Sequence, residues 1–316
     1  RKGMRGPVPF AQRIKSENCG NRSFCQRHRR ALAYGLLLYG RSFTPESICL
    51  HTEHRRVARL YADSIADLAG LSGSITLREV RRQEGKSVYV ATVDSLADRL
   101  AVLETFRSPQ GGAQAGLLEE QIPPGEEGAF LSGVFLACGG VSDPEKDYRA
   151  EFSVGGRRLC QDLEAFLGRV LASPKVTTRR NSYLVYYKES EQIEDLLTLI
   201  GAPKCSMELM EVKMVKELRN KVNRATNCET ANLSKTVAAG VAQVQAIQAI
   251  QAAGGLNLLE EELRELAQLR LDHPELSLRE LGGQLRTPIS RSGVNHRMRR
   301  VLEFASRLEQ KGRETQ

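Results

Sequence analysis

The hydrophobic positions near the C-terminus recur at helical spacing in two consecutive stretches. Leu278, Leu281 and Leu285 stand at i, i+3 and i+7, which predicts one short helix with an apolar stripe. A second, longer stripe follows and consists of Met298, Val301, Leu302, Ala305 and Leu308. Pro288 lies between the two stripes and disfavours helical geometry at the residue before it. The pattern therefore predicts a helix-turn-helix motif between Leu276 and Leu308.

Polar residues at both helix starts agree with this motif. Ser277 followed by Glu280 has the spacing of a capping box, in which each side chain satisfies a free backbone N–H. Ser290 can cap the second helix, and Ile289 and Val294 then stand at the N′ and N4 positions of a hydrophobic staple. These local signals place the turn independently of the apolar stripes.

Further upstream, one order of apolar and polar stretches occurs twice. An apolar helix with an internal glycine is followed by a strand, an amphipathic helix, a strand pair and a helix, and Gly133 matches Gly35 at an offset of 98 residues. The predicted elements are 23–40, 47–51, 53–71, 75–81, 86–93 and 94–104, and then 128–140, 141–154, 155–172, 175–180, 182–187 and 190–200. Two copies predict an α+β domain with pseudo-two-fold symmetry. The two glycines would let the apolar helices cross closely.

The pattern and the local composition divide the chain into five segments. These are a first repeat (1–107), a connector rich in Gly, Pro, Gln and Glu (108–128), a second repeat (129–205), linker helices (206–255) and an all-α helix-turn-helix domain (256–316). Gly254 and Gly255 are expected to end the linker helices. We expect a fragment that starts near Leu256 to fold alone.

The charge of the second C-terminal helix indicates double-stranded DNA as the partner. Between Leu281 and Leu302 there are five arginines, one histidine and no acidic residue. The side chains expected to face base edges in the major groove are Arg291, Ser292, Asn295, His296 and Arg299. Arg286, Arg297 and Arg300, with Ser277 and Ser290 at the helix starts, complete the expected DNA-binding set, and the three arginines are placed for phosphate. The alternative is a solvated basic face on an ordinary helical hairpin.

A second polar stripe lies in the linker segment and consists of Arg219, Asn220, Asn223, Arg224 and Asn227. Asn is a mediocre helix former, so such a stripe suggests a partner. It could contact the sugar-phosphate backbone or fix the angle between domains. A solvated polar face is the alternative.

Composition narrows the remaining possibilities. A net charge of +8 favours a polyanionic partner, whereas aromatic residues make up only 5% of the chain and Trp is absent, which disfavours base stacking by a single-strand or RNA-processing factor. The longest apolar runs are shorter than the roughly 20 residues of a membrane span, and the N-terminal stretch lacks an apolar signal core, so we expect a cytoplasmic, nucleoid-associated protein.

Seven cysteines without a CxxC pair indicate a reduced protein. Cys19, Cys25 and His28 form the one tight cluster, but no second ligand pair follows, so neither a metal nor a cofactor is predicted.

Three segments resemble the WhiA family of bacterial regulators. They are FLSGVFLACGGVSDPEKDYRAEF (130–152), NRATNCETANLSKT (223–236) and SLRELGGQLRTPISRSGVNHRMRR (277–300), and the resemblance extends over essentially the whole chain. It implies a degenerate LAGLIDADG homing-endonuclease-like domain joined to a C-terminal helix-turn-helix. It also implies a transcription regulator linked to cell division and, in spore formers, to sporulation, with the transcription machinery or another regulator as a further partner.

The resemblance also raises the alternative of an active, metal-dependent LAGLIDADG endonuclease. Such nucleases carry a metal-binding acid just before the last glycine of each central helix, and the matching positions here are Gly40 and Cys138. Neither residue can offer a carboxylate to Mg²⁺. Asp143, Glu145 and Asp147 lie past the helix end, where solvated acids are usual. We therefore predict a scaffold without catalytic activity and a protein that is not an enzyme.

Overall fold

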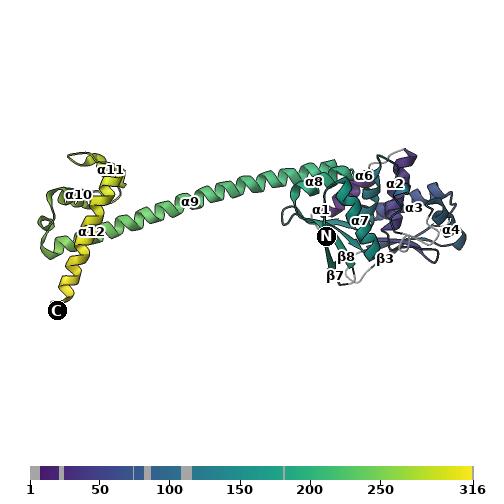
Figure 1. The fold of residues 1–316 in the computed structure, drawn as a ribbon, viewed down its shortest axis with the longest axis horizontal. Coiled ribbons are helices and arrows are strands. Elements are labelled where there is room, and N and C mark those ends of the chain that lie inside the picture. Colours follow the sequence, from purple (N-terminus) through teal and green to yellow (C-terminus); the bar gives the residue numbers. More distant parts are fainter. Residues whose placement is uncertain are drawn as a thin grey trace, which may run out of the picture. The chain divides into compact units, whose positions relative to one another are not determined.

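The computed structural model describes residues 8–20, 25–73, 75–81, 87–107, 116–180 and 182–314. Two compact units, Arg1–Glu217 and Leu218–Gln316, each contain a hydrophobic core (Figure 1). Part of the predicted connector, 108–115, lies outside the described residues, and its remainder contains the short 3₁₀ helix η1 (Glu119–Gln121). The predicted first helical run also begins at two residues, 23 and 24, that are not described.

Two antiparallel sheets with the same strand order form the framework of the first unit. The first has the order β1-β2-β4-β3 and the second the order β5-β6-β8-β7. The strands of the first are β1 (Ser42–Phe43), β2 (Ile48–Thr52), β3 (Ile75–Arg81) and β4 (Ser87–Val93); those of the second are β5 (Gly139–Val141), β6 (Ala150–Val154), β7 (Lys175–Arg179) and β8 (Ser182–Tyr187). The identical order confirms the predicted repeat. The sequence did not predict β1 and β5, because strands of two and three residues have too few positions to show an alternation.

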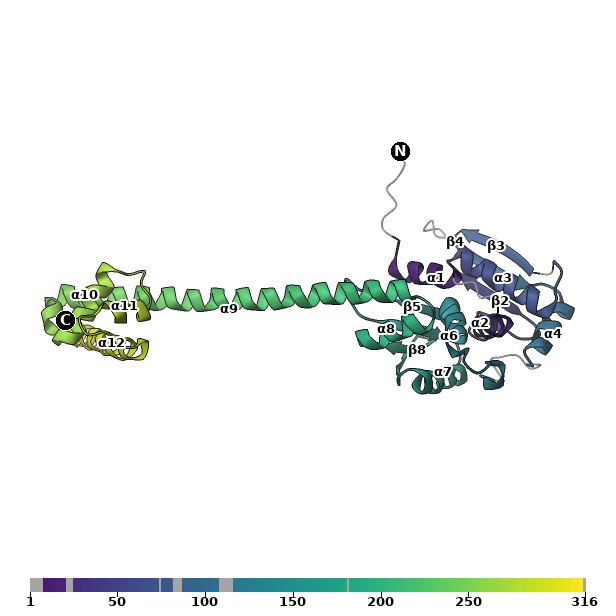
Figure 2. The same ribbon diagram turned by 90° about the horizontal axis from the view of Figure 1, so that it is seen from above.

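Helices cover these sheets in the predicted order. The first repeat carries α2 (Gln26–Leu38), α3 (Arg55–Ala69) and α4 (Leu96–Thr105), and the second carries α6 (Glu127–Cys138), α7 (Arg157–Val170) and α8 (Ser190–Leu199). Figure 2 shows α2 and α6 side by side at the middle of the unit. The structure thus has the predicted α+β class and pseudo-two-fold arrangement.

The two central helices meet backbone to backbone at the predicted glycines. A Cβ added to Gly35 would lie 2.3 Å from the carbonyl oxygen of Phe130, and one added to Gly133 would lie 2.1 Å from that of Leu32. Real Cβ atoms do not approach a carbonyl oxygen so closely. Only glycine fits at either position, which confirms the predicted close crossing.

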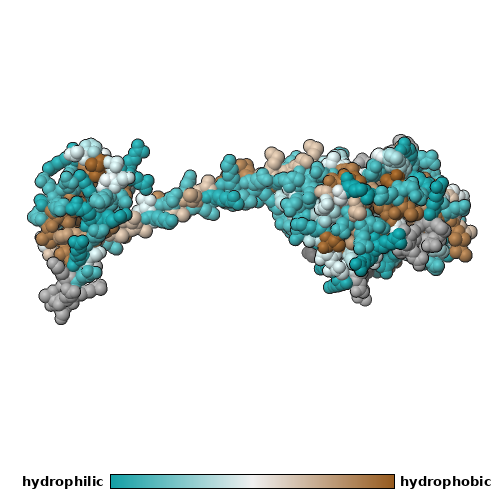
Figure 3. Space-filling model, in the orientation of Figure 1, coloured by the Kyte–Doolittle hydropathy of each residue, from teal (hydrophilic) through white to brown (hydrophobic). Residues whose placement is uncertain are grey.

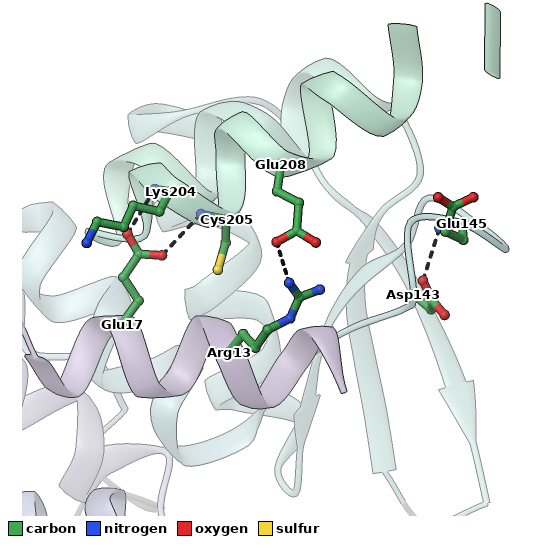
Figure 4. A network of polar contacts seen from close by, with 7 residues as sticks. All are labelled: Arg13, Glu17, Asp143, Glu145, Lys204, Cys205 and Glu208. Atoms are coloured by element: carbon green, nitrogen blue, oxygen red, sulfur yellow. Dashed lines mark hydrogen bonds and ion pairs between the residues drawn. The ribbon is translucent and has the colours of Figure 1, made fainter. Parts of the chain in front are cut away.

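One further helix of the first unit, α1 (Phe10–Gly20), was not predicted. Its apolar stripe consists of little more than Phe10 and Ile14, both buried, so one turn of spacing was too weak a signal. This helix packs along the start of α9 (Pro203–Gly254). The Glu17 carboxylate accepts hydrogen bonds from the backbone N–H groups of Lys204 (2.9 Å) and Cys205 (3.1 Å), as Figure 4 shows. It therefore caps two of the free N–H groups at the start of α9.

The linker segment forms one helix, α9, where the sequence suggested separate helices. Gly240 is the only glycine inside it before Gly254. A Cβ added there would meet its nearest neighbour, the Pro274 carbonyl oxygen, at an ordinary 3.8 Å, and the helix continues through this position. The predicted end at Gly254 and Gly255 is confirmed, because both have positive φ angles (152° and 90°). No helix within the described ranges combines the length and the apolar character that crossing a membrane requires.

The second unit is all-α. After α9 come the 3₁₀ helix η2 (Leu256–Leu258), α10 (Glu261–Asp272), α11 (Leu278–Gln284) and α12 (Arg291–Glu314). Its core includes Ile247 and Ile250 of α9, both fully buried. A boundary at Leu256 leaves these two residues outside the fragment, so we expect the predicted fragment to be less stable than one that includes them.

Candidate nucleic-acid interface

The predicted capping box forms at the start of α11. The Ser277 hydroxyl accepts a hydrogen bond from the Glu280 N–H at 3.3 Å, and the Glu280 carboxylate accepts one from the Ser277 N–H at 2.8 Å. Leu281 is buried, as the stripe predicted, and Leu278 is half-buried. The first helix of the motif therefore begins where its sequence indicates.

A close backbone contact sets the turn between α11 and α12. The Ile289 N–H donates to the carbonyl oxygen of Gly282 at 3.1 Å, and a Cβ on Gly282 would lie 2.5 Å from the Ile289 carbonyl oxygen. Gly282 is therefore required at this position. Sequence reasoning missed its role, although a Gly-Gly pair inside a short helical stripe is the signal that could have shown it.

The start of α12 also follows the prediction. The Ser290 hydroxyl accepts a hydrogen bond from the Gly293 N–H at 3.2 Å, and Ile289 and Val294 belong to the same hydrophobic core. The side chains of Val294, Met298, Val301 and Ala305 are buried, whereas Leu302 and Leu308 are half-buried. This stripe holds α12 against α10 and α11 and turns the opposite side of the helix to solvent.

A buried arginine positions α11, and sequence reasoning did not single it out. Arg270, on α10, is 3% exposed, and its guanidinium donates to the carbonyl oxygens of Pro274 (3.2 Å) and Leu276 (2.6 Å). Burial lowers the pKa of Arg270 from its ordinary value. Because these carbonyl groups immediately precede Ser277, the arginine holds the segment that carries the cap.

The exposed side of α12 carries five polar residues that the sequence assigned to base edges. Within the described part of the chain, none of them makes a hydrogen bond or an ion pair with another protein group. They are Arg291, Ser292, Asn295, His296 and Arg299, and all are exposed. Figure 3 shows that the visible surface of this unit is mostly hydrophilic. The structure thus brings these residues together on one side of the helix.

The arginines assigned to phosphate lie beside glutamates of α10. Arg297 Nη2 lies 2.8 Å from Glu262 Oε2, and Arg300 Nη2 lies 2.8 Å from Glu260 Oε2. Arg286 is highly exposed, with its Nη1 at 3.8 Å from Glu261. The sequence did not predict these contacts, because no acidic residue lies between Leu281 and Leu302 and the glutamates come from the start of α10.

The linker stripe lies on α9. All five of its members are exposed, and no hydrogen bond or ion pair links them to other described residues. They are Arg219, Asn220, Asn223, Arg224 and Asn227. The structure therefore leaves them available without showing what they contact.

The expected metal-binding positions do not form a site for a divalent cation. Cys138 is the last residue of α6, and burial raises the pKa of its thiol to about 12, so the group is neutral. Gly40 follows α2 and has no side chain. Across the described ranges, no three His, Cys, Asp or Glu side chains are placed to hold a metal. The acids Asp143, Glu145 and Asp147 are exposed, as expected; Figure 4 shows the first two in their loop.

A protein cation lies beside Cys138. Lys15 of α1 is buried, and its Nζ donates to the Leu136 carbonyl oxygen at 3.2 Å, near the C-terminal end of α6. Burial lowers the pKa of this ammonium, whereas the neighbouring Cys138, Cys19 and Glu53 act to raise it. Burial and then the Lys15 charge lower the pKa of His54 to about 4. An ammonium at this position opposes the binding of a second cation.

Comparison with known proteins gives consistent results for both units. A family model described as "WhiA LAGLIDADG-like domain" matches residues 127–219, and one described as "WhiA C-terminal HTH domain" matches residues 222–305. The chain is 34% identical over 317 residues to "Probable cell division protein WhiA" of Clostridium acetobutylicum, an alignment that covers 97% of this chain and all of that protein. The protein of the same name from Clostridium perfringens is 38% identical over 268 residues, which cover 83% and 85% of the two chains.

A solved structure shows the same fold. It is that of full-length DUF199/WhiA from Thermatoga maritima, with a TM-score of 0.55 and 20% sequence identity. The match covers 95% of this chain and 99% of that one. The first repeat, which the family models leave unmatched, is therefore part of a shared architecture.

Proposed function

The chain belongs to the WhiA family, and we propose from this premise that it is a sequence-specific double-stranded DNA-binding protein that regulates transcription. One observation carries the proposal. The exposed side of α12 presents arginine and asparagine side chains, free of protein partners among the described residues, directly after a capped turn. In helix-turn-helix docking, the N-terminal part of the second helix meets base edges in the major groove.

The chemistry of these side chains fits base reading. Arg291 and Arg299 can each donate two parallel hydrogen bonds to guanine, and Asn295 can pair with adenine through its amide. Ser292 and His296 can add single hydrogen bonds on the same face. Because none of these groups must first break a protein contact, they can adapt to a base sequence at little cost.

The first unit supplies a scaffold whose nuclease chemistry we propose to be lost. Gly40 and Cys138 offer no carboxylate, and the Lys15 side chain already occupies the end of α6, where its Nζ donates to the Leu136 carbonyl oxygen. Phosphodiester hydrolysis by this type of enzyme needs a metal to stabilise the attacking and leaving oxygens. The unit would then contribute affinity or partner contacts, with the transcription machinery or another regulator as the partner.

The names of the curated relatives bear on the biological role. They are called cell division proteins, and we extend that role to this chain, together with sporulation if its source forms spores. The exposed arginines and asparagines of the α9 stripe are proposed to touch sugar-phosphate as well. Association with DNA would place the protein in the cytoplasm, on the nucleoid.

Binding measurements on two variants test base reading. A target sequence is first selected from a random duplex pool with the full chain, and Asn295→Ala and Arg291→Ala are then compared on that target and on a scrambled duplex. Each variant should lose roughly 1–3 kcal/mol on the target, because a bidentate pair is removed, and less on the scrambled DNA. Arg307→Ala, which removes an exposed charge further along α12, serves as the control.

The control should weaken binding to both duplexes by a similar factor. Circular dichroism confirms that each variant keeps its helices. Equal losses on target and scrambled DNA for Asn295→Ala and Arg291→Ala would show that α12 anchors the protein without reading sequence.

A further inference from the structure

Four glutamates at the start of α10 face arginines of the helix-turn-helix motif. Two of them contact arginines of α12, and the other two contact Arg286 in the turn before it. Glu260 stands at the N-cap position of α10, and Glu261 and Glu262 occupy its first turn, where the helix dipole favours negative charge. Glu265 lies on the next turn and accepts a hydrogen bond from the Arg286 N–H at 2.6 Å. We name these four residues the acidic flank. They are Glu260, Glu261, Glu262 and Glu265.

Two of these carboxylates, those of Glu260 and Glu262, are more exposed than the guanidinium groups that they contact. The Glu262 side chain is 69% exposed and its partner Arg297 only 21%. The Glu260 side chain is 68% exposed and its partner Arg300 44%. A phosphate that approaches this side of the domain therefore meets negative charge beside each arginine, and it competes with a carboxylate for the guanidinium group.

The two sides of α12 consequently differ in their response to DNA. On the exposed side, Arg291 and Arg299 have no partner among the described residues and can neutralise phosphate or read bases directly. On the flank, a glutamate already offsets the charge of Arg297 and another that of Arg300. These arginines therefore release fewer counterions when the protein binds DNA. Counterion release supplies the sequence-independent part of DNA affinity.

We propose that the acidic flank is an electrostatic filter for specificity. It competes with DNA phosphate for Arg297 and Arg300, lowers affinity for arbitrary sequence, and leaves binding dependent on the base contacts of Arg291, Asn295 and Arg299. This proposal rests on the proposed function, and it assigns a different role to arginines that the sequence assigned to phosphate. It also places DNA against the exposed side of α12 and away from the start of α10.

The salt dependence of DNA binding gives the size of the change in affinity that we expect when these carboxylates are removed. Each phosphate that a protein neutralises contributes about 0.9 to the slope of log affinity against log salt. Removing two carboxylates should free Arg297 and Arg300 for phosphate. The slope for random DNA should then steepen by roughly two, and the affinity at moderate salt should rise on the order of tenfold.

The test uses the full chain with Glu260→Gln and Glu262→Gln combined. Gln keeps the shape of Glu and removes its charge. Glu104→Gln combined with Glu211→Gln is the matched control, because it changes net charge equally at two exposed positions of the first unit, on α4 and α9, whose side chains have no partner among the described residues. Affinity for a mixed-sequence duplex pool and for the selected target is measured over a salt series.

We expect the first pair of substitutions to raise affinity for the mixed pool about tenfold and to steepen its salt slope by roughly two. Affinity for the target should rise less, so the ratio of specific to non-specific binding falls. The control pair should change both affinities by less than about twofold, because neither carboxylate is paired with an arginine and a change in net charge alone is largely screened by salt. A rise in mixed-pool affinity no larger than that of the control would overturn the filter.

A second pair of substitutions closes a mutant cycle. Arg297→Gln with Arg300→Gln should have little effect on mixed-pool binding in the natural background and should abolish the gain in the Glu→Gln background. Equal losses in both backgrounds would mean that the arginines already contact phosphate and would also overturn the filter. If the natural chain bound no duplex at all, the proposed function would fail instead, so the two failures are distinguishable.

Discussion

At the scale of single residues, Gly133 has no side chain and therefore lets the two central helices of the first unit pack closely. Its Cα faces the carbonyl oxygen of Leu32 so closely that an added Cβ would lie 2.1 Å away. Backbone atoms of a buried helix cannot move aside as a flexible side chain can. Gly133→Ala should therefore force α2 and α6 apart and lower the free energy of unfolding by about 3 kcal/mol, as measured by urea denaturation of the full chain.

Gly168 of α7 provides the matched control. A Cβ there would meet its nearest neighbour, the Ser173 hydroxyl, at an ordinary 3.6 Å. Gly168→Ala should leave stability unchanged or raise it by up to about 1 kcal/mol, because Ala loses less backbone entropy in a helix. Similar destabilisation by both substitutions would show that the crossing does not depend on close backbone contact.

At the scale of elements, α1 joins two functional parts of the first unit. Lys15 brings its ammonium to the end of α6, and Arg13 and Glu17 on the same helix bind the first turns of α9 (Figure 4). The Arg13 guanidinium lies 2.5 Å from the Glu208 carboxylate. One short helix therefore covers the expected metal position and also anchors the helix that leads to the second unit.

The ends of the central helices carry a prediction about activity. Because Gly40 and Cys138 provide no carboxylate, the chain should not cleave duplex DNA in Mg²⁺ or Mn²⁺. Plasmid nicking and cleavage of the selected target are measured with the purified full chain. A metal-dependent activity that remains with the protein through successive purification steps would contradict the inactive scaffold.

At the scale of the whole molecule, the position of the domain boundary is testable. The second core includes Ile247 and Ile250 of α9, both with no exposed area. A fragment from Asn232 onward keeps them, whereas a fragment from Leu256 onward lacks both. Each buried isoleucine contributes about 1.5–3 kcal/mol, so the shorter fragment should be less stable by roughly 3–6 kcal/mol in thermal and denaturant unfolding.

The same loss of stability should appear when the two isoleucines are substituted and the rest of the longer fragment is kept. Ile247→Ala combined with Ile250→Ala in the longer fragment removes most of the same apolar surface, so it should lower stability by a similar amount. If the fragment from Leu256 unfolded at the same denaturant concentration as the longer one, the core would not depend on α9.

The sequence by itself determined the local features of this protein. The capping box of Ser277 and Glu280, the break at Pro288 and the buried stripe through Met298 involve residues within a few positions of one another, so spacing alone specifies them. The repeat could also be predicted from the sequence, because two copies of one apolar pattern form the same helices and strands. Gly35 and Gly133 were identifiable because a glycine in an apolar helix needs a packing reason.

Only the tertiary structure decided which distant groups meet. Arg300 pairs with Glu260 across 40 residues, and Lys15 reaches the Leu136 carbonyl across 121. Neither contact leaves a periodic signal, because each depends on the angle at which two helices pack. The same holds for β1 and β5, which exist only through their pairing with β2 and β6. Local chemistry therefore specified the helix-turn-helix, whereas packing determined which of its arginines pair with glutamates of α10.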